Sequence, residues 1–219
     1  MLVFAMVAHE YAHAVTALQQ GDDTAYTLGR VTLNPIPHID PWMSLLLPAL
    51  LFFLSHGQFT FGGAKPVPVN SRKFLNYRRG DIIVSAAGVT TNLFLSILFA
   101  GLFVLLGLVA RTAPAAVGVV DTAQRMMVFG IYLNLLLCFF NLIPIPPLDG
   151  SHLLYHALPP GAGAWYRRLG RFGYLPLFAL MFLFQPALAI LLTPARAGLI
   201  FLLRLILPYR AGDGWNIFS

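Results

Sequence analysis

Apolar runs separated by short polar stretches make up most of the chain. The first run, residues 2–18, would reach roughly 26 Å as a helix, which is barely the thickness of the hydrocarbon core of a bilayer. We therefore predict a first helix over residues 1–19, just long enough to span. Further apolar helices are predicted at 81–110, 123–146, 172–192 and 197–207. This pattern indicates a chain that crosses a membrane several times.

Other segments do not fit a full crossing. Residues 20–61 begin with a stretch rich in Gly, Asp and Pro, in which apolar positions alternate as in short strands or loops. Within it, residues 42–54 are apolar but only about a dozen long and contain Pro48, which favours a re-entrant segment. The helix over 123–146 must break at the prolines from Pro144 onward, because proline lacks an amide donor and clashes with the preceding turn.

Composition agrees with a membrane protein. Hydrophobic residues make up 58% of the 219 residues and charged residues 10%, whereas soluble domains carry about 25% charge. A soluble enzyme is excluded. The formal net charge of +6 does not indicate nucleic-acid binding, because the basic residues lie in short loops between apolar runs, as is typical of cytoplasmic loops. These residues are Lys65, Arg72, Lys73, Arg78, Arg79, Arg167, Arg168 and Arg171.

The predicted fold is an all-α polytopic membrane protein. We expect a bundle of about five transmembrane helices, with a short re-entrant segment and short strands or loops near the cytoplasmic side. Residues 1–158 would form a membrane core that includes a cytoplasmic basic loop over 62–80. Residues 159–219 would form C-terminal transmembrane helices that act as a gate or as the surface of a homo-oligomer.

Candidate chemistry begins with Glu10, which is the only Glu in the chain and lies inside the first apolar run. An ionisable residue within a membrane segment is expensive and indicates function. Glu10 belongs to the pattern His9-Glu10-Tyr11-Ala12-His13, and residues four apart lie on the same face of a helix. Both imidazoles can therefore bind one Zn²⁺ beside the carboxylate of Glu10. The alternative, two histidines satisfied by neighbouring helices, leaves Glu10 unexplained.

A catalytic zinc needs a third protein ligand, and Asp149 is the best candidate. Asp149 follows the proline-broken helix, in backbone that at membrane depth is tolerated only where it lines a cavity. The other carboxylates lie in polar loops, near the C-terminus or, as Asp81, at a position where a helix cap is expected. An alternative is that Asp149 is itself the N-cap of a helix over 151–158.

These motifs resemble a known family. His9-Glu10-Tyr11-Ala12-His13 together with the segment from Asn141 to Gly150 (Asn-Leu-Ile-Pro-Ile-Pro-Pro-Leu-Asp-Gly) is similar to the two signature motifs of the site-2 protease family of intramembrane zinc metalloproteases. The stretches 34–41 and 64–70 resemble compact bacterial members without a PDZ domain. The resemblance covers roughly residues 1–158. It implies one zinc ion per chain, with His9, His13 and Asp149 as ligands, and Glu10 as the catalytic residue.

Four further residues are candidates for supporting or substrate-binding roles. The family often carries Gly-Pro-x-x-Asn, whereas this chain reads Gly88-Val89-Thr90-Thr91-Asn92, so Asn92 matches and the proline does not. Asn92 would hold substrate or an oxyanion, or else form a hydrogen bond between helices. Asn141 belongs to the second motif. His38 would shape substrate access or donate hydrogen bonds to the ligands, and His152 would line the cavity or support Asp149.

The depth of the candidate ligands in the membrane predicts the direction in which their helices run. His9 and His13 can meet Asp149 only if the helices over 1–19 and 123–146 run in the same direction. One crossing between them, at 81–110, satisfies this requirement if residues 42–54 do not cross. The site then opens toward the cytoplasm of a multi-pass protein in the cell membrane.

The predicted function is hydrolysis of peptide bonds in or near transmembrane segments. By resemblance, the substrates would be single-pass membrane proteins such as anti-sigma factors, or remnant signal peptides. The Gly- and Pro-rich residues 57–70 could present an edge strand to an unwound substrate. The alternative function is a non-proteolytic zinc-binding membrane protein, either a metal carrier or a scaffold, which would need ligands but no base.

Overall fold

The computed structural model describes residues 1–57, 60, 62–212 and 215. Over these residues the chain consists of helices and irregular segments, with no strand. Residues 26–33 were expected to form short strands or loops, and no strand is present there. A one-turn helix and turns stand there instead, closed by backbone bonds such as that from the Arg30 amide to the Ala25 carbonyl at 2.8 Å. The α-helices are α1 (Leu2–Gln19), α2 (Thr24–Thr27), α3 (Leu47–Leu54), α4 (Tyr77–Thr112), α5 (Val117–Asn141), α6 (Asp149–Ala157), α7 (Pro160–Arg167), α8 (Leu175–Phe182), α9 (Gln185–Leu191) and α10 (Thr193–Ile206).

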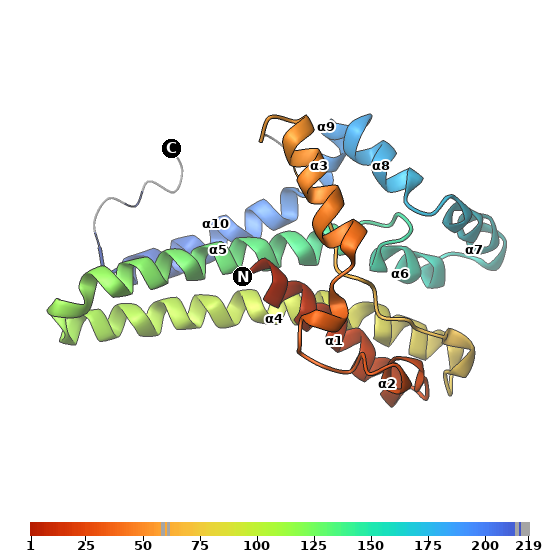
Figure 1. The fold of residues 1–219 in the computed structure, drawn as a ribbon, viewed down its shortest axis with the longest axis horizontal. Coiled ribbons are helices and arrows are strands. Elements are labelled where there is room, and N and C mark those ends of the chain that lie inside the picture. The colour runs from red at the N-terminus through yellow and green to blue at the C-terminus, as the bar shows by residue number, and fades with distance from the viewer. Residues whose placement is uncertain (58–59, 61, 213–214, 216–219) are drawn as a thin grey trace.

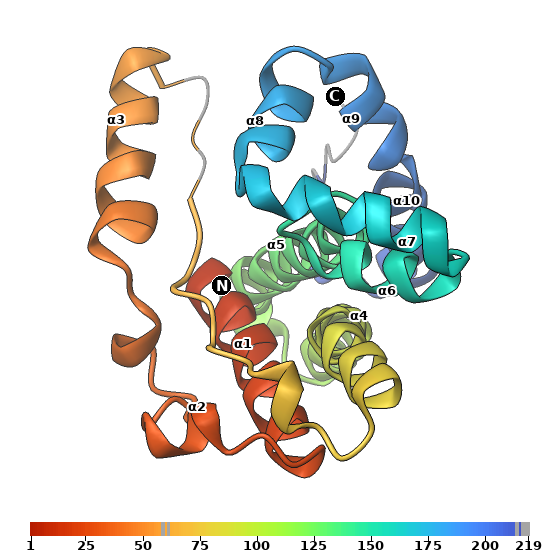
Figure 2. The same cartoon turned by 90° about the vertical axis from the view of Figure 1, so that its right-hand side faces the viewer.

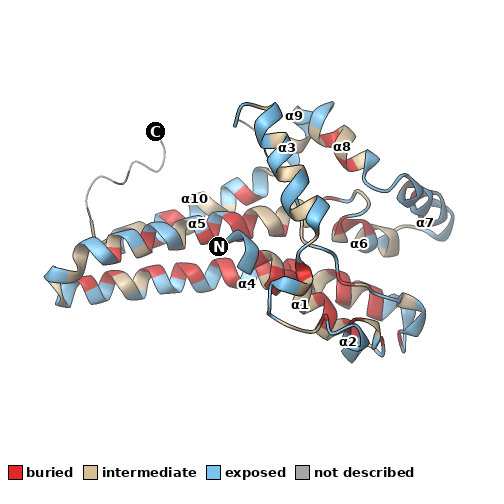
Figure 3. Cartoon of the chain, viewed as in Figure 1, coloured by how far each residue is buried: buried red, intermediate tan, exposed pale blue. Residues whose placement is uncertain are grey.

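A long antiparallel hairpin of α4 and α5 forms the scaffold, and α10 packs along it (Figure 1). The contact faces carry the buried residues of the main core, seen as the red positions facing each other in Figure 3. Phe103 of α4, Ile131 of α5 and Leu203 of α10 are all 0% exposed there. Gly130 lets the two long helices approach, since a Cβ at that position would lie 2.9 Å from the Phe99 ring.

Within the described residues, two helices are long and apolar enough to cross a membrane, α4 with 36 residues and the 28-residue stretch Pro114–Asn141 that contains α5. A third span results if α9 and α10, bent by 42°, are counted together. The expected bundle of about five spans is not confirmed. α1 is not among these spans, because its polar residues lower its mean hydropathy. The apolar run 172–192 forms two short helices, α8 and α9, because the helix is interrupted before Gln185 and Pro186.

The boundaries of the long helices also differ from the prediction. α4 begins at Tyr77, where the Asn76 side chain accepts a hydrogen bond from the Arg79 amide at 3.0 Å. α5 ends at Asn141, before the prolines. The apolar residues 42–54 lie in one helical stretch, in which a π-helix over Pro41–Leu46 continues into α3. Asp40 starts this stretch by accepting hydrogen bonds from two backbone amides.

The remaining elements gather at one end of the hairpin. Figure 2 shows α1 lying against α4, with α6 and α7 above the start of α4 and with α3 standing apart from the other helices. α6 packs on α4 as well. The beginning of α4 therefore receives two elements that are distant in sequence, α1 and α6, and the candidate site lies where they meet.

Candidate metal centre

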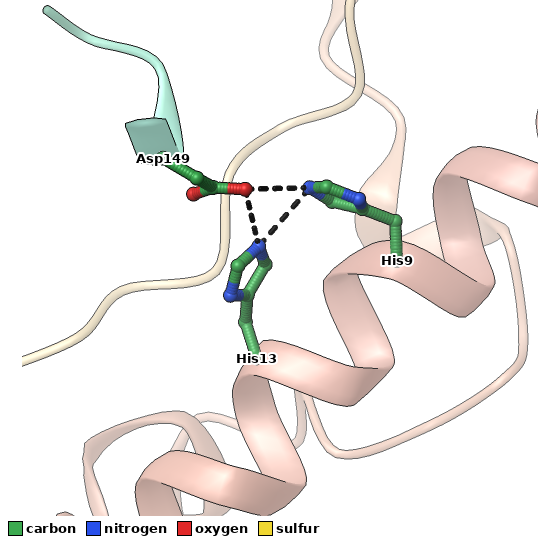
Figure 4. Close-up of side chains that lie close together, drawn as sticks. All are labelled: His9, His13 and Asp149. Atoms are coloured by element: carbon green, nitrogen blue, oxygen red, sulfur yellow. Dashed lines mark hydrogen bonds and ion pairs between the residues drawn. The ribbon is translucent and has the colours of Figure 1, made fainter. Parts of the chain in front are cut away.

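The three predicted metal ligands converge on one point between α1 and α6. His9 and His13 stand one turn apart on α1 and are buried, and Asp149 is the first residue of α6. The Nε2 atoms of the two histidines lie 3.0 Å apart. Asp149 Oδ2 lies 3.3 Å from each of them. Figure 4 shows all three side chains pointing toward one another, an arrangement that could hold a metal ion.

A chain of buried amides fixes the hydrogen on His9. Asn134 Nδ2 donates to the backbone carbonyl of Gly130 at 2.9 Å, so its Oδ1 accepts from Asn92 Nδ2, also at 2.9 Å. Asn92 Oδ1 then faces His9 Nδ1 at 2.6 Å and can only accept. His9 must therefore carry its hydrogen on Nδ1, which leaves the lone pair of Nε2 directed at the centre.

His13 has the same tautomer for a simpler reason. Its Nδ1 lies 2.8 Å from the backbone carbonyl of Val84, which has no hydrogen to give. The neighbouring Gly88 makes this approach of α1 to α4 possible. A Cβ at position 88 would lie 2.5 Å from His13 Nε2 and 2.6 Å from His9 Nε2, so any side chain there would displace both imidazoles.

These donors fit a divalent metal. Two neutral imidazoles present Nε2 lone pairs to each other at 3.0 Å, and the buried Oδ2 of Asp149 makes no hydrogen bond. Three acceptors facing one another repel unless a cation lies among them. Histidine nitrogens with one carboxylate oxygen are a common donor set for zinc, and donors around tetrahedral zinc stand roughly 3.3 to 3.5 Å apart. Histidines that bind metals usually donate their other N–H to a carbonyl or carboxylate, as both do here.

The turn after α5 brings Asp149 to the centre. Gly150 allows this turn to close, since a Cβ there would lie 2.2 Å from the Leu142 carbonyl oxygen. Leu148 occupies the N-cap position of α6, and Asp149 is inside the helix. The alternative that Asp149 is an N-cap is therefore wrong.

A cavity of about 440 Å³ adjoins the centre. Glu10 lies on its wall, and one carboxylate oxygen, Oε2, accepts a hydrogen bond from the backbone amide of Val67 at 2.7 Å. Asn141 also lines the cavity, with its amide nitrogen bonded to the Leu137 carbonyl at 2.9 Å. Other lining residues include Met6, Pro66, Phe140 and Tyr174. The cavity gives Glu10 and the metal ligands a common space in which a substrate could lie.

Two predicted supporting residues have different partners from those expected. His38 is outside the cavity lining, and its Nε2 contacts the Thr32 carbonyl at 3.0 Å, so it donates no hydrogen bond to the ligands. His152 does line the cavity, but its Nδ1 contacts Asp81 at 3.2 Å. Asp81 is not a helix cap, because α4 begins four residues earlier. It is buried and also contacts His156 Nε2 at 2.6 Å.

Sequence reasoning missed Asn134, Gly88 and Val67. Asn134 and the predicted Asn141 are the two Asn residues of α5, and an Asn within an apolar run was itself a signal of a buried contact. Gly88 and the Val67 amide act through backbone geometry, which no residue pattern in the sequence reveals. Asn92, one of the predicted supporting residues, contacts the predicted ligand His9.

Comparison with curated proteins finds relatives that are all described as putative zinc metalloproteases. One, "Putative zinc metalloprotease YwhC" of Bacillus subtilis, is 38% identical over 174 residues, which are 80% of this chain and 74% of the relative. Another, "Putative zinc metalloprotease Rip2" of Mycolicibacterium smegmatis, is 33% identical over 85% of this chain and 66% of the relative. Rip2 of Mycobacterium tuberculosis is 35% identical over 152 residues, and the chain spans about half of its length, 52%. No family model matches the chain, and no solved structure matches it.

Proposed function

Since the chain belongs to the site-2 protease family of zinc metalloproteases, we propose that it hydrolyses peptide bonds within the membrane at the centre formed by His9, His13 and Asp149. The observation that carries this proposal is the convergence of three metal-binding atoms within 4.8 Å of one another, with Glu10 on the wall of the same cavity. The three side chains would hold one zinc ion. When bound, zinc supplies Lewis acidity that polarises the scissile carbonyl and makes water more acidic.

Glu10 performs the proton transfers in this mechanism. Its carboxylate accepts a proton from the attacking water as the new C–O bond forms, and then gives that proton to the departing amine nitrogen as the C–N bond breaks. The proton taken from water is therefore returned to the product amine. His9 and His13 are assigned no proton transfer: Asn92 and the Val84 carbonyl hold their hydrogens on Nδ1, which leaves both Nε2 atoms directed at the centre.

The protein is proposed to be a multi-pass protein of the cell membrane whose active site faces the cytoplasm. α4, at 36 residues, is roughly 54 Å long and exceeds the hydrocarbon thickness, so part of it extends beyond the core. Basic side chains gather at the end where α4 begins: Arg78 donates to the His156 carbonyl, and Arg167 donates to the Tyr77 hydroxyl. These basic side chains support a cytoplasmic assignment of this end by the positive-inside rule. It is also the end that carries the candidate centre.

The proposed substrates are single-pass membrane proteins. A transmembrane helix must unwind before hydrolysis, because its internal hydrogen bonds shield the peptide carbonyls. Residues 62–70 run extended beside the cavity and could pair with such an unwound segment. Residues 58, 59 and 61 of the predicted edge lie outside the described residues. The C-terminal helices α8 to α10 are proposed as a gate or a surface for homo-oligomers.

The proteolytic role is favoured over a metal carrier or scaffold. Relatives at 33% and 38% identity carry the name zinc metalloprotease. A carrier or a scaffold would also need no general base, whereas Glu10 lines the cavity beside the ligands.

The test is cleavage of a single-pass reporter in proteoliposomes by the purified protein and its Glu10→Gln variant. We expect Glu10→Gln to lower the cleavage rate by about 10²-fold to 10⁴-fold while zinc content stays the same, because the amide cannot accept the proton. Asp121→Asn is the matched control, since this carboxylate lies at the start of α5, in contact with Arg125 and Trp215. Undiminished cleavage by Glu10→Gln would refute the proposed mechanism.

A further inference from the structure

Residues 64–70 form an extended segment, here called the strap, that passes α1 on the cavity side. Figure 2 shows it as the yellow-orange trace that descends from the region of α3 to the start of α4. Its sequence, Ala-Lys-Pro-Val-Pro-Val-Asn, has a proline on each side of Val67. Proline fixes its own φ and restricts the residue before it, so this segment is stiff and extended.

Buried polar residues hold the strap at both ends. At the first end, the Lys65 amide donates to the His38 carbonyl at 2.8 Å, and Arg30 Nη2 donates to the Lys65 carbonyl at 2.8 Å. At the other end, the Asn70 amide donates to Asp22 Oδ2 at 2.6 Å. Arg30, His38 and Asp22 are 7%, 2% and 0% exposed. Polar groups buried this deeply are costly unless they are bonded, so these contacts fix the strap in place.

Val67 lies between these two attachment points and touches Glu10. Its side chain packs with Ala14 and Ala25 in a small buried cluster. Its amide donates to Glu10 Oε2 at 2.7 Å. Pro66 and Pro68 have no N–H, so among these three consecutive residues only Val67 can donate.

We propose that the strap positions Glu10 through the backbone amide of Val67, and that Val67 is a positioning residue for hydrolysis. The inference rests on the proposed function, in which Glu10 moves the proton. A glutamate side chain has three rotatable bonds and samples many rotamers when it is free. Fixing Oε2 to the strap confines the carboxylate to the cavity wall and leaves Oε1 to accept the proton. A backbone amide of the strap is more restricted than a side-chain donor, because hydrogen bonds hold the strap at both ends.

The first test removes the donor and keeps the rest of the residue. Val67→Pro deletes the N–H, and Val67→Ala is the matched control because it retains the N–H and loses only side-chain contacts. We expect Val67→Pro to lower kcat for the reporter about tenfold to a hundredfold, with KM and zinc content unchanged. Val67→Ala, which keeps the N–H, should lose much less kcat than Val67→Pro. A purely structural role would change both variants alike, or would reduce zinc content.

A second variant guards against misfolding caused by three consecutive prolines. Incorporating the α-hydroxy analogue of valine at position 67 by nonsense suppression replaces the amide by an ester, which removes the hydrogen and preserves the side chain. We expect the same loss of kcat in the purified full-length protein. Full kcat in the ester variant would overturn the inference, and it would leave the proposed function intact if Glu10→Gln is still inactive. Cleavage by Glu10→Gln at the wild-type rate would instead overturn the proposed function itself.

The attachments provide an independent measurement. Arg30→Gln removes the charge and shortens the side chain that holds the Lys65 carbonyl, without touching Glu10. We expect kcat to fall with zinc content unchanged, and the double variant Arg30→Gln with Val67→Pro to be no slower than Val67→Pro alone, because both changes break one interaction. If the losses of kcat in the two single variants add up in the double variant, Arg30 does not act through the Val67 amide.

Discussion

Asn92 on α4 donates a hydrogen bond to Asn134 on α5 at 2.9 Å, and both side chains are essentially inaccessible, at 0% and 1% exposure. This contact orients the Asn92 amide so that its oxygen faces His9. Asn134 therefore acts with the Ala5 carbonyl, which accepts from the same Asn92 nitrogen at 3.4 Å, to leave His9 Nε2 facing the candidate centre. The long hairpin thus controls the chemistry of the centre as well as its position.

Asn134→Leu should weaken zinc binding. Without the Asn134 oxygen, the Asn92 amide can rotate and present its nitrogen to His9, which destroys the acceptor. We expect zinc affinity to fall by about tenfold, in the lower part of the range for partners that orient metal ligands. Competition with a chromophoric chelator measures it. Gln124→Leu is the control, because it also removes a buried amide from α5 but one bonded to the Phe103 and Tyr209 carbonyls. Equal affinity in both variants would contradict the orienting role.

Gly88→Ala should prevent formation of the centre. The new methyl group would lie 2.5 Å from His13 Nε2, which is far inside van der Waals contact, so α1 must shift away from α4. We expect loss of stoichiometric zinc, measured by atomic absorption on the purified protein. Gly101→Ala is a matched control on the same helix, since nothing lies within 4 Å of its added Cβ. Zinc retention in Gly88→Ala would show that the close approach is not required.

The contact between His152 and Asp81 should make stability depend on pH. The hydrogen bond that His152 donates to Asp81 is the largest cause that raises the pKa of His152 above 6.5. The charge of Asp149 raises this pKa further, while burial and Arg167 oppose the rise. Because this pKa is raised, the contact between His152 and Asp81 contributes fully to the free energy of unfolding below pH 6.5. The contribution is lost as the pH rises through the pKa of His152 in the folded protein. Thermal unfolding in detergent should thus show a Tm that declines as the pH rises from 6.5 through the pKa of folded His152.

Asp81→Asn should flatten that decline, because the amide cannot stabilise the charged imidazole. Asp121→Asn, which changes a carboxylate that contacts Arg125 instead, should leave the decline unchanged. An identical pH dependence in Asp81→Asn and in the wild type would show that the His152 contact does not contribute.

Leu203→Ala should detach α10 from the hairpin. Leu203 is 0% exposed in the core between α4, α5 and α10, and deleting a buried leucine side chain costs about 2 to 5 kcal/mol. We expect a lower free energy of unfolding by that amount in detergent. Leu205→Ala on the same helix is the control, since Leu205 is 54% exposed. A similar loss for both would mean that α10 is not held by this core.

The convergence of His9, His13 and Asp149 was predictable, because metal-binding residues are rare in this chain and two of them recur with the period of a helix. Histidines four apart on a helix, the single Glu between them and an Asp after a proline break are all visible in the sequence. The long hairpin was likewise apparent from uninterrupted apolar runs. The partners of these residues were not apparent, because the Asn134 contact depends on how α5 packs on α4 and the approach at Gly88 depends on how α1 packs on α4.

The less regular segments were predicted less well, for a physical reason. Residues 172–192 read as one apolar crossing, yet they form two short helices with buried Leu177 and Leu180 packed on the turn that follows α5. Apolar content cannot distinguish a span from a helix pair that packs on the protein. In the same way, the alternation near residues 26–33 left short strands or loops open, and local backbone hydrogen bonds close turns there.

The three candidate ligands come from opposite ends of residues 1–158, two from α1 and one from α6. A metal ion bound by all three would act as a cross-link that closes almost the whole core into a single loop, and closing so long a loop removes much conformational entropy from the unfolded chain. The folded population would then depend on the supply of free metal, by about 2.7 kcal/mol when zinc exceeds its dissociation constant a hundredfold. Metal starvation would therefore reduce the amount of intact protein as well as the activity of each molecule.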